Sequence, residues 1–151
     1  MIEAIYICSG DTAAQTSVDA VEAVAGKGLV GDRYFGADEY PGQNVTLIEA
    51  EEIERFNDEH GQSLGLDATR RNIVTRGVRL NELVGKEFRI GDALLFGAEL
   101  CEPCADLGAG LENDAISKAE IVRALVHRAG LRTDVLEGGT LEVGMPLDVT
   151  A

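Results

Sequence analysis

The stretch E-F-R-I-G-D-A-L-L-F-G-A-E at residues 87–99 decides the fold class of this chain. Glu87 to Ile90 and Ala93 to Glu99 are two strand-like runs, and only Gly91 and Asp92 separate them. A two-residue connection that contains glycine is typical of an antiparallel β-hairpin. The stretch therefore predicts two neighbouring antiparallel strands.

Further short runs of strand type lie on both sides of this hairpin. Val18 to Ala25 is ambiguous, because Val18, Val21 and Val24 also fit a helix, and we favour a strand. Residues 9–17 read as a loop and residues 26–33 as a glycine-rich turn. The other expected strands are Ile2 to Cys8, Gln43 to Ile48, Arg71 to Thr75, Thr133 to Leu136 and Leu147 to Val149.

Helical signals are few. Glu49 to His60 reads as an acidic helix that ends at Gly61. Ser117 and Glu120 form a capping box that opens a second helix, closed by Gly130, with Ile121, Leu125 and Val126 on its buried side. Gly108 and Gly110 read as a loop. Many short strands with two or three peripheral helices predict a mostly β (α+β), β-barrel-like fold in a single domain over residues 1–151.

The charge of the chain excludes some partners. Its formal net charge is −14, which argues against a nucleic-acid or anionic membrane surface. The segment 70–89 differs, because it carries 6 basic and 2 acidic side chains, against 3 and 14 in residues 1–69. This basic segment contains Arg70, Arg71, Arg76, Arg79 and Arg89, whose planar guanidinium groups suit phosphate. We expect a small anionic ligand, with carboxylate pairing as the alternative.

Three cysteines are too few and odd in number for a disulfide framework. Met1, Ile2 and Glu3 do not begin a signal peptide, and no apolar run approaches the length of a membrane helix. We therefore expect a cytoplasmic protein with reduced thiols and no membrane partner.

Two of the cysteines form the motif Cys101-x-x-Cys104, for which four interpretations stay open. A structural zinc site would need further ligands from Cys8, His60 or His127, which have no paired spacing. A redox pair would need the motif to open a helix in a βαβ unit. The cysteines could also be small buried hydrophobes. The fourth interpretation is a single functional thiol, with Cys104 favoured because Pro103 stiffens its approach. Each histidine is more simply a helix-end cation.

Six segments in this order resemble the MOSC domain, the family named for the C-terminal domain of molybdenum cofactor sulfurase. The resemblance covers about residues 26–148, and no single segment is specific to one activity. The matching segments are G-L-V-G-D-R-Y (28–34), Q-N-V-T-L-I-E-A-E (43–51), R-R-N-I-V-T-R-G (70–77), L-V-G-K-E-F-R-I-G-D-A (83–93), C-E-P-C-A-D-L (101–107) and H-R-A-G-L-R-T-D-V-L-E-G-G (127–139).

The resemblance implies roles for particular residues. Cys104 stands at the family's cysteine position, which carries sulfur or ligates molybdenum, so it is the candidate catalytic residue and metal ligand. Arg71 and Asn72 match the family's R-x-N-type element, next to Arg70, and Gly31, Asp32 and Arg33 match its G-D-R turn. The candidate residues for binding the molybdenum cofactor (molybdopterin) are Arg70, Arg71, Asn72, Asp32 and Arg33. Tyr34 stands where many members have histidine.

The resemblance also implies functions and partners. One function is binding of the molybdenum cofactor, with possible reduction of N-hydroxylated compounds by electrons from an electron-transfer protein. Another is a sulfur carrier that holds a persulfide supplied by a cysteine desulfurase. The alternative from another class is a non-catalytic small-molecule binding module with structural cysteines. The first two functions require that the sulfur of Cys104 opens into a pocket floored by guanidinium groups from the segment that begins near residue 70.

Overall fold

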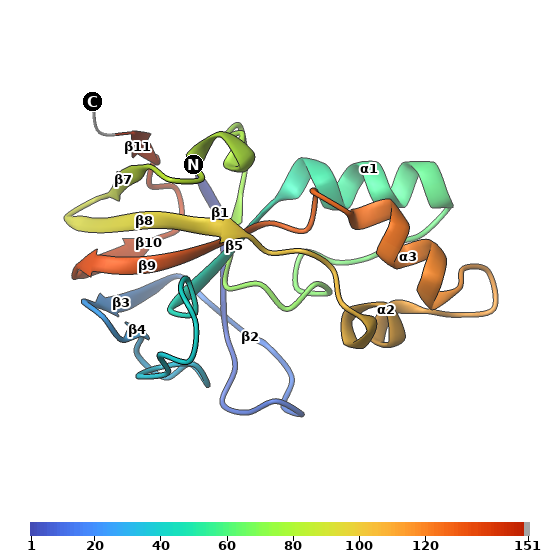
Figure 1. Cartoon of the computed structure of the whole chain (residues 1–151), viewed down its shortest axis with the longest axis horizontal. Helices are drawn as coiled ribbons and strands as arrows, with labels where there is room; N and C mark the ends of the chain where they lie inside the picture. The colour runs from blue at the N-terminus through green and yellow to red at the C-terminus, as the bar shows by residue number, and fades with distance from the viewer. Residues whose placement is uncertain (150–151) are drawn as a thin grey trace.

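The computed structural model describes residues 1–149 and combines two β-sheets with three α-helices in this part of the chain (Figure 1). One sheet has eight strands in the order β11-β7-β8-β9-β5-β6-β1-β2, and the other has three in the order β10-β3-β4. The strands are β1 (Ile2–Ile7), β2 (Thr16–Val18), β3 (Ala20–Val24), β4 (Gly28–Leu29), β5 (Val45–Glu49), β6 (Ile73–Thr75), β7 (Glu87–Ile90), β8 (Ala93–Leu100), β9 (Leu131–Glu137), β10 (Gly139–Glu142) and β11 (Asp148–Val149).

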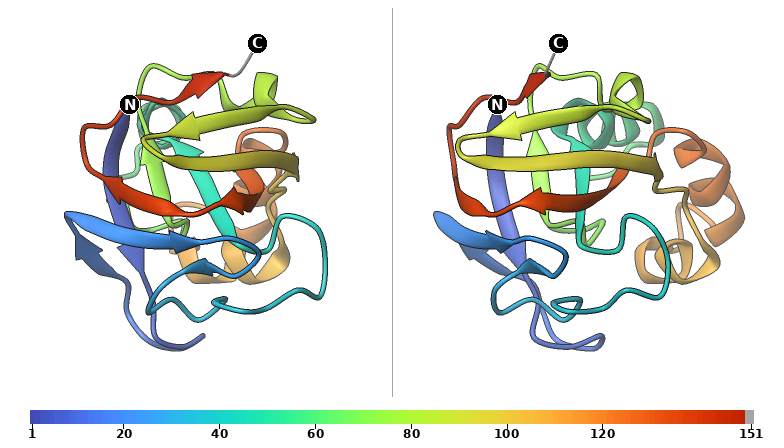
Figure 2. Two further views of the ribbon diagram at one scale, coloured as in Figure 1. Left: turned by 90° about the vertical axis from the view of Figure 1, so that its left-hand side faces the viewer. Right: turned by 60° about the vertical axis from the view of Figure 1, so that its left-hand side comes forward.

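The predicted hairpin is confirmed: β7 and β8 are antiparallel, with Phe88 opposite Leu95 and Ile90 opposite Ala93. β5 and β6 are parallel, and the chain crosses between them through a helix. The other named strand pairs of residues 1–149 are antiparallel. The eight-stranded sheet curls strongly, and the three-stranded sheet lies against its open side (Figure 2). The fold is thus mostly β and barrel-like, as predicted, in the form of a curled half-barrel.

The main hydrophobic core lies inside this curled sheet. Its buried side chains come from strands that are far apart in sequence, so the core holds the two sheets together. Burial of large apolar side chains such as these contributes about 1.5–3 kcal/mol each. The largest fully buried members of this core are Phe88, Ile2, Ile5, Leu29, Leu47, Ile73, Leu80, Ile90, Leu95 and Leu131.

The helices gather at one end of the molecule (Figure 1). Ile53 of α1 packs in a small cluster with Ile48 of β5 and Val74 of β6, which attaches this end to the sheet. A second cluster, around Phe56 and Ile121, joins the helices to one another. The helices are α1 (Ala50–His60), α2 (Ala105–Leu111) and α3 (Lys118–Leu125), with a 3-10 helix η1 (Leu80–Leu83). None of the helices in residues 1–149 has the length and apolarity that crossing a membrane requires.

Several local predictions are confirmed. The helix after β5 ends at Gly61, whose φ of 61° is left-handed. Ser117 caps α3, since its hydroxyl accepts a hydrogen bond from the backbone N–H of Glu120 at 3.2 Å. The ambiguous run that begins at Val18 is extended, with β2 ending at Val18 and β3 beginning at Ala20.

Other local predictions are wrong. The glycine-rich stretch after Cys104 forms α2 and is not a loop. A Cβ atom on Gly108 would lie 2.7 Å from Cγ of Lys118, so this glycine allows α2 to pack closely on α3. α3 ends at Leu125, before Gly130, and Val126 is 42% exposed. A further strand, β10, begins at Gly139 and was not among the expected strands.

Candidate functional site

The short segment between β8 and α2 carries both cysteines of the Cys101-x-x-Cys104 motif, and their exposure differs. Cys101 is buried, and its backbone N–H donates to the carbonyl of Gly130 at 2.8 Å. Cys104 is exposed and occupies the position just before α2. Between them, the carboxylate of Glu102 accepts from the backbone N–H of His127 at 2.7 Å and contacts Nδ1 of the same residue at 2.7 Å. Glu102 therefore fixes the segment that carries Cys104.

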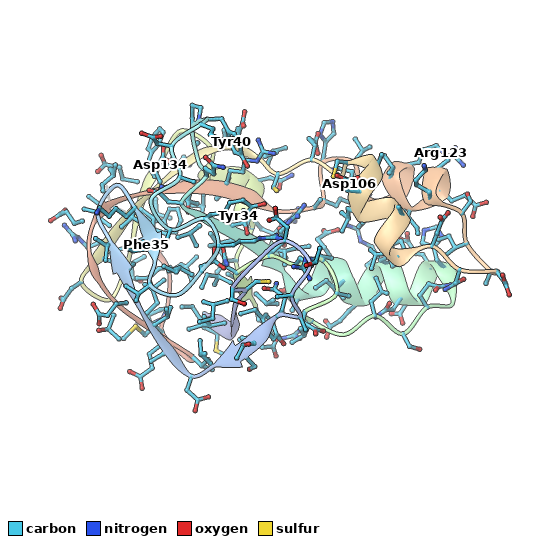
Figure 3. The ribbon with its side chains drawn as sticks, turned by 90° about the horizontal axis from the view of Figure 1, so that it is seen from below. Tyr34, Phe35, Tyr40, Asp106, Arg123 and Asp134 are labelled. Carbon is cyan, nitrogen blue, oxygen red and sulfur yellow. The ribbon has the colours of Figure 1, made fainter. Side chains whose placement is uncertain are left out.

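Cys104 lines a pocket of about 510 Å³ at the junction of the sheet and the helices. In Figure 3 the pocket residue Tyr34 belongs to the sheet part of the molecule and Asp106 to α2. We name this cavity the thiol pocket. Its lining consists of Asp11, Arg33, Tyr34, residues 69–71, Cys104, Asp106 and Leu107. The structure thus brings Arg33, Arg70 and Arg71 to the same pocket as Cys104.

Arg70 holds the wall formed by the loop after β1. Its Nη2 lies 3.1 Å from the sulfur of Cys8 and donates to the carbonyls of Asp11 at 3.3 Å and Ala13 at 3.0 Å. Cys8 is buried. Arg70 also has a φ of 59°, a left-handed conformation that costs a non-glycine residue about 1–2 kcal/mol. In this conformation the guanidinium group of Arg70 contacts the loop after β1 and also lines the thiol pocket.

Arg71 is held by two backbone carbonyl groups. Its Nε donates to the carbonyl of Ala129 at 2.9 Å and its Nη1 to the carbonyl of Thr69 at 3.3 Å. Both acceptors are neutral carbonyls, so Arg71 has no carboxylate partner among residues 1–149 and its charge is not neutralised. Arg71 therefore brings a positive charge to the lining of the thiol pocket.

Arg33 and Tyr34 form the sheet-side wall. Nη1 of Arg33 lies 3.3 Å from the exposed carboxylate of Asp11, and the guanidinium carbon lies 4.7 Å from the centre of the Tyr34 ring. Burial raises the pKa of Tyr34, and the charge of Arg33 opposes that shift. The phenol therefore stays protonated at neutral pH and offers an O–H donor to the pocket.

Asp32 and Asn72, also candidate cofactor-binding residues, are buried in the framework and do not line the thiol pocket. The Asp32 carboxylate accepts from the backbone N–H of Cys8 at 3.0 Å and of Tyr34 at 3.3 Å. The Asn72 amide accepts from the backbone N–H of Thr46 at 3.1 Å and donates to the carbonyl of Tyr6 at 3.1 Å. Asp32 thereby fixes the turn that carries Arg33, and Asn72 fixes the start of the strand that follows Arg71.

The remaining arginines of the basic segment are paired elsewhere. Arg76 bridges Glu3 and Glu54, which holds the pKa of Glu54 below its usual range. Arg79 lies 3.8 Å from Glu49, and Arg89 lies 2.9 Å from Glu137. For these three arginines the alternative of carboxylate pairing is the one that the structure shows.

Sequence reasoning missed Thr69, Asp11 and Asp106 as pocket residues. Thr69 is 2% exposed, and its hydroxyl oxygen is buried without a hydrogen-bond partner among residues 1–149. A buried polar atom without a partner costs about 1–3 kcal/mol, so this hydroxyl needs a water or a ligand atom as its partner. No sequence pattern marks Thr69 beyond its place next to the arginine pair.

The thiol pocket contains a single cysteine. Among residues 1–149 there is no group of three or more histidine, cysteine, aspartate or glutamate side chains placed to hold a metal ion. His127 pairs with Glu102, and His60 ends α1 with its ring 5.0 Å from that of Phe56. A metal at Cys104 would therefore take its other ligands from outside this chain's side chains.

The fold and the pocket together define a class of protein: a curled β-sheet domain with an exposed thiol among arginines where the sheet meets the helices. The chain belongs to the MOSC domain family, whose sequence model matches residues 15–148. No curated protein matches the sequence significantly.

Solved structures share this fold. YuaD from Bacillus subtilis superposes with a TM-score of 0.85 and 18% identity, over 98% of this chain and 93% of that protein. YiiM from Geobacillus stearothermophilus gives a TM-score of 0.78 with 17% identity, over 100% of this chain and 75% of that one. YiiM from Escherichia coli gives 0.71 with 20% identity, over 100% and 70%. At these identities the likeness concerns the fold alone.

Proposed function

We propose that this protein binds the molybdenum cofactor in the thiol pocket, with Cys104 as the thiolate that ligates the metal. One observation carries the proposal: the exposed thiol of the chain shares a pocket with three arginines, although the protein as a whole is strongly acidic. The family match supports the same interpretation, since the MOSC family is associated with this cofactor.

The residues present fit such a group. The pocket volume of about 510 Å³ lies in the usual range for small-molecule sites, about 300–1,000 Å³. Arg33 and Arg70 each use a single terminal nitrogen in their contacts within residues 1–149, which leaves other N–H groups for phosphate oxygens. The unpartnered hydroxyl of Thr69 adds a further donor. Thiolate is the form of cysteine that binds metals.

We assign the roles as follows. Arg33 and Arg71 bind the anionic part of the cofactor, and Arg70 holds the loop that forms one wall. Tyr34 donates a hydrogen bond through its phenol, and Asp32 and Asn72 keep the two arginine-bearing segments in place. When bound, the cofactor supplies a redox-active metal, so that an N-hydroxylated compound can be reduced with electrons from an external electron-transfer protein.

A second candidate function is that of a sulfur carrier, and the exposure of Cys104 favours it. The Cys104 thiolate attacks the terminal sulfur of a persulfide on a cysteine desulfurase. A sulfur–sulfur bond forms at Cys104, the corresponding bond in the donor breaks, and the donor leaves as a thiolate. A location in the cytoplasm, where such partners are found, stays a prediction.

The cofactor proposal is tested by expressing the full chain in a cofactor-replete host and measuring molybdenum and pterin per purified chain. We expect stoichiometric amounts in the wild type and at least about a tenfold loss in Cys104→Ser. Cys101→Ser is the matched control and retains the cofactor. If the wild type holds no more cofactor than Cys104→Ser, the proposal is wrong.

The sulfur-carrier candidate is tested by intact-mass analysis after incubation with a cysteine desulfurase and free cysteine. One added sulfur in the wild type that is absent from Cys104→Ser supports it. If neither this assay nor the cofactor assay responds, the alternative of a non-catalytic binding module is supported, and Cys104→Ser, a change at an exposed position, should alter the stability by less than about 0.5 kcal/mol.

A further inference from the structure

A separate cavity of about 430 Å³ lies where the end of β9 meets the loop before β5, and we name it the acidic pocket. It is lined by residues 38–41 and 134–136, Gly26 and Asn44, none of which lines the thiol pocket. Tyr40 and Leu136 give it apolar surface, and these side chains are 38% and 43% exposed. Figure 3 shows Tyr40 and Asp134 on the same side of the sheet part of the molecule. This surface suits the apolar part of an occupant.

Carboxylates surround the apolar surface of the acidic pocket. Asp38 and Glu39 are exposed, and their carboxylates form neither a hydrogen bond nor an ion pair in the described part of the chain. Asp134 adds a third carboxylate to the lining. Arg132 lies outside the lining, and its Nη1 pairs with Glu99 at 2.8 Å. The charge that this pocket offers to an occupant is therefore negative.

The loop that carries two of these carboxylates is held in place. The backbone N–H of Glu39 donates to Oε1 of Gln43 at 2.8 Å, and the backbone N–H of Gly42 donates to Oδ1 of Asp134 at 2.8 Å. A Cβ atom on Gly42 would lie 2.5 Å from Cβ of Arg132, so the loop packs closely on β9. A surface that is already ordered loses less conformational entropy when it binds a partner.

A second observation, independent of the carboxylates, points to an occupant. Asn44 lines the pocket and is 5% exposed, and its Oδ1 accepts from the backbone N–H of Val135 at 3.0 Å. Its Nδ2 donates to no group within residues 1–149. Nδ2 is not sealed in the interior either, because the buried side-chain atoms without a partner in these residues belong to Glu51 and Thr69. This amide therefore opens to the pocket as a free donor.

An occupant of the acidic pocket must offer three features. It needs an acceptor for Nδ2 of Asn44, an apolar stretch against Tyr40 and Leu136, and a positive charge for Asp38 and Glu39. A lysine or arginine side chain combines an apolar stem with a charged head, and the adjoining main-chain carbonyl is an acceptor. An extended basic segment of a polypeptide therefore supplies all three.

The acidic pocket is also a neighbour of the thiol pocket. Tyr34 lines the thiol pocket and Asp38 the acidic pocket, and four residues of chain span at most about 14 Å. A protein docked at the acidic pocket is therefore close to the pocket that contains Cys104.

We propose that the acidic pocket docks an extended basic segment of a partner protein, with its lysine or arginine stem against Tyr40 and Leu136 and a main-chain carbonyl on Asn44. The choice of a protein as occupant rests on the proposed function, because both candidate functions of Cys104 require a second protein. The net charge of −14 attracts a basic partner and disfavours nucleic acids and anionic membranes.

The binding test is a titration of the full, isotope-labelled chain with acetyl-alanyl-arginyl-alanine amide, followed by the backbone amide signals in nuclear magnetic resonance spectra. We expect the largest shifts at Tyr40, Asn44 and Leu136. The same peptide with citrulline, the neutral analogue of arginine, should bind at least about threefold more weakly, because exposed ion pairs contribute modestly to affinity. Equal binding of the two peptides, or shifts confined to other regions, would overturn the inference.

Propylguanidine distinguishes a polypeptide from a small organic cation, because it has the stem and the head of arginine without the main chain. We expect it to bind at least about threefold more weakly than the arginine peptide, since it offers no acceptor to Asn44. If propylguanidine binds as tightly as the peptide, the pocket takes a free cation and the docking of a segment is refuted.

The apolar wall is tested with Leu136→Ala, which we expect to weaken binding of the arginine peptide at least about threefold. Val143→Ala is the matched control, because Val143 is 40% exposed and does not line the pocket, and it should leave binding unchanged. Both positions are exposed, so neither change removes a core side chain. Equal affinity of Leu136→Ala and the wild type would contradict the inference.

Charge is tested with the double variant Asp38→Asn and Glu39→Gln, which should reduce the preference for the arginine peptide over the citrulline peptide by half or more. Asp58→Asn with Glu59→Gln, an exposed pair on α1, changes the net charge equally and should leave the preference unchanged. The peptide titrations do not require the cofactor. Loss of peptide selectivity with normal cofactor content would refute this inference alone, and absence of cofactor with normal peptide binding would refute the proposed function alone.

Discussion

At the scale of single residues, the three thiols differ in environment although their chemistry is the same. Cys8 and Cys101 are 1% and 5% exposed, whereas Cys104 is exposed in the thiol pocket. The residue type alone does not tell which of Cys101 and Cys104 is buried and which is exposed. This difference in exposure depends on where β8 ends, at Leu100, and where α2 begins, at Ala105.

We predict that iodoacetamide modifies Cys104 faster than Cys8 and Cys101 by about two orders of magnitude, because a buried thiol reacts only after local unfolding. Peptide mapping by mass spectrometry after timed labelling measures the three rates. Cys104→Ser should remove the fast phase, and Cys101→Ser should leave it. Labelling of Cys101 at the rate of Cys104 would contradict the exposure that the structure shows.

Thr69 gives a second prediction at this scale. Thr69→Val removes a hydroxyl that has no partner, so we expect the free energy of unfolding of the ligand-free protein to stay unchanged or rise by about 1 kcal/mol. Thr133→Val is the matched control. It removes a buried hydroxyl that donates to the carbonyl of Val45 at 2.8 Å, and it should cost about 1–2 kcal/mol.

Urea denaturation of the two variants measures this difference, and cofactor content then shows whether Thr69 serves a ligand. A loss of stability in Thr69→Val as large as that in Thr133→Val would mean that the Thr69 hydroxyl has a structural partner. A stable variant with reduced cofactor content would support its role in the pocket wall.

At the scale of elements, α2 shows how glycine misleads a sequence-based prediction. Gly108 and Gly110 suggested a loop, yet both lie in a helix. Helix propensity is a weak signal that packing overrides, and the packing partner of Gly108 is Lys118, which no local pattern identifies. The hairpin of β7 and β8 and the capped start of α3 depend on neighbouring residues alone, and they were predicted correctly.

The two glycines of α2 therefore predict opposite effects of the same substitution. Gly108→Ala places a Cβ atom 2.7 Å from Cγ and 3.0 Å from the carbonyl oxygen of Lys118, and should destabilise the protein by about 1–3 kcal/mol. Gly110→Ala meets open space and should stabilise it by about 0.5–1 kcal/mol through helix propensity. Thermal unfolding of the pair tests this, and equal effects would show that α2 does not pack on α3 as described.

At the scale of the whole molecule, the thiol pocket could be anticipated only through the family resemblance. Its wall residues come from positions near 11, 33, 70 and 104, and sheet order, which brings them together, does not follow from local patterns. The sequence did indicate a soft thiol and a group of arginines. It could not show that Arg76, Arg79 and Arg89 pair with carboxylates, because their partners are Glu54, Glu49 and Glu137, distant in sequence.

Global stability should depend on pH through Glu49, which lies where β5, α1 and η1 meet. Burial raises the pKa of Glu49, and the hydrogen bond from the backbone N–H of Leu80 opposes that shift. A carboxyl group with a raised pKa in the folded state favours folding at pH values below its unfolded pKa. That contribution is lost as the pH rises through the folded pKa.

We therefore expect Glu49→Gln to be more stable than the wild type at pH 7, with a difference that shrinks as the pH falls through the raised folded pKa of Glu49 and is gone below its unfolded pKa of about 4.3. Glu54→Gln is the control of opposite sign, because Arg76 lowers the pKa of Glu54 and the salt bridge is present only above that pKa. Urea denaturation from pH 4 to pH 8 measures both. A Glu49→Gln variant that loses stability at pH 7 would contradict this account.

The parallel pairing of β5 and β6 has a consequence for how far this protein can vary in length. The chain crosses through α1 and returns to the end of the sheet where β5 begins. There the Asn72 side chain bonds to Thr46 and Tyr6 and fixes the register of β6. Extra residues inserted at the exposed Ser63 would lengthen the connection between α1 and β6 and leave Arg70 and Arg71 beside the sulfur of Cys104. One residue inserted between Arg71 and Asn72 would instead turn the Arg71 side chain to the opposite face, since side chains alternate along an extended chain. Natural or engineered variants should therefore tolerate length changes before Arg70 and not after it.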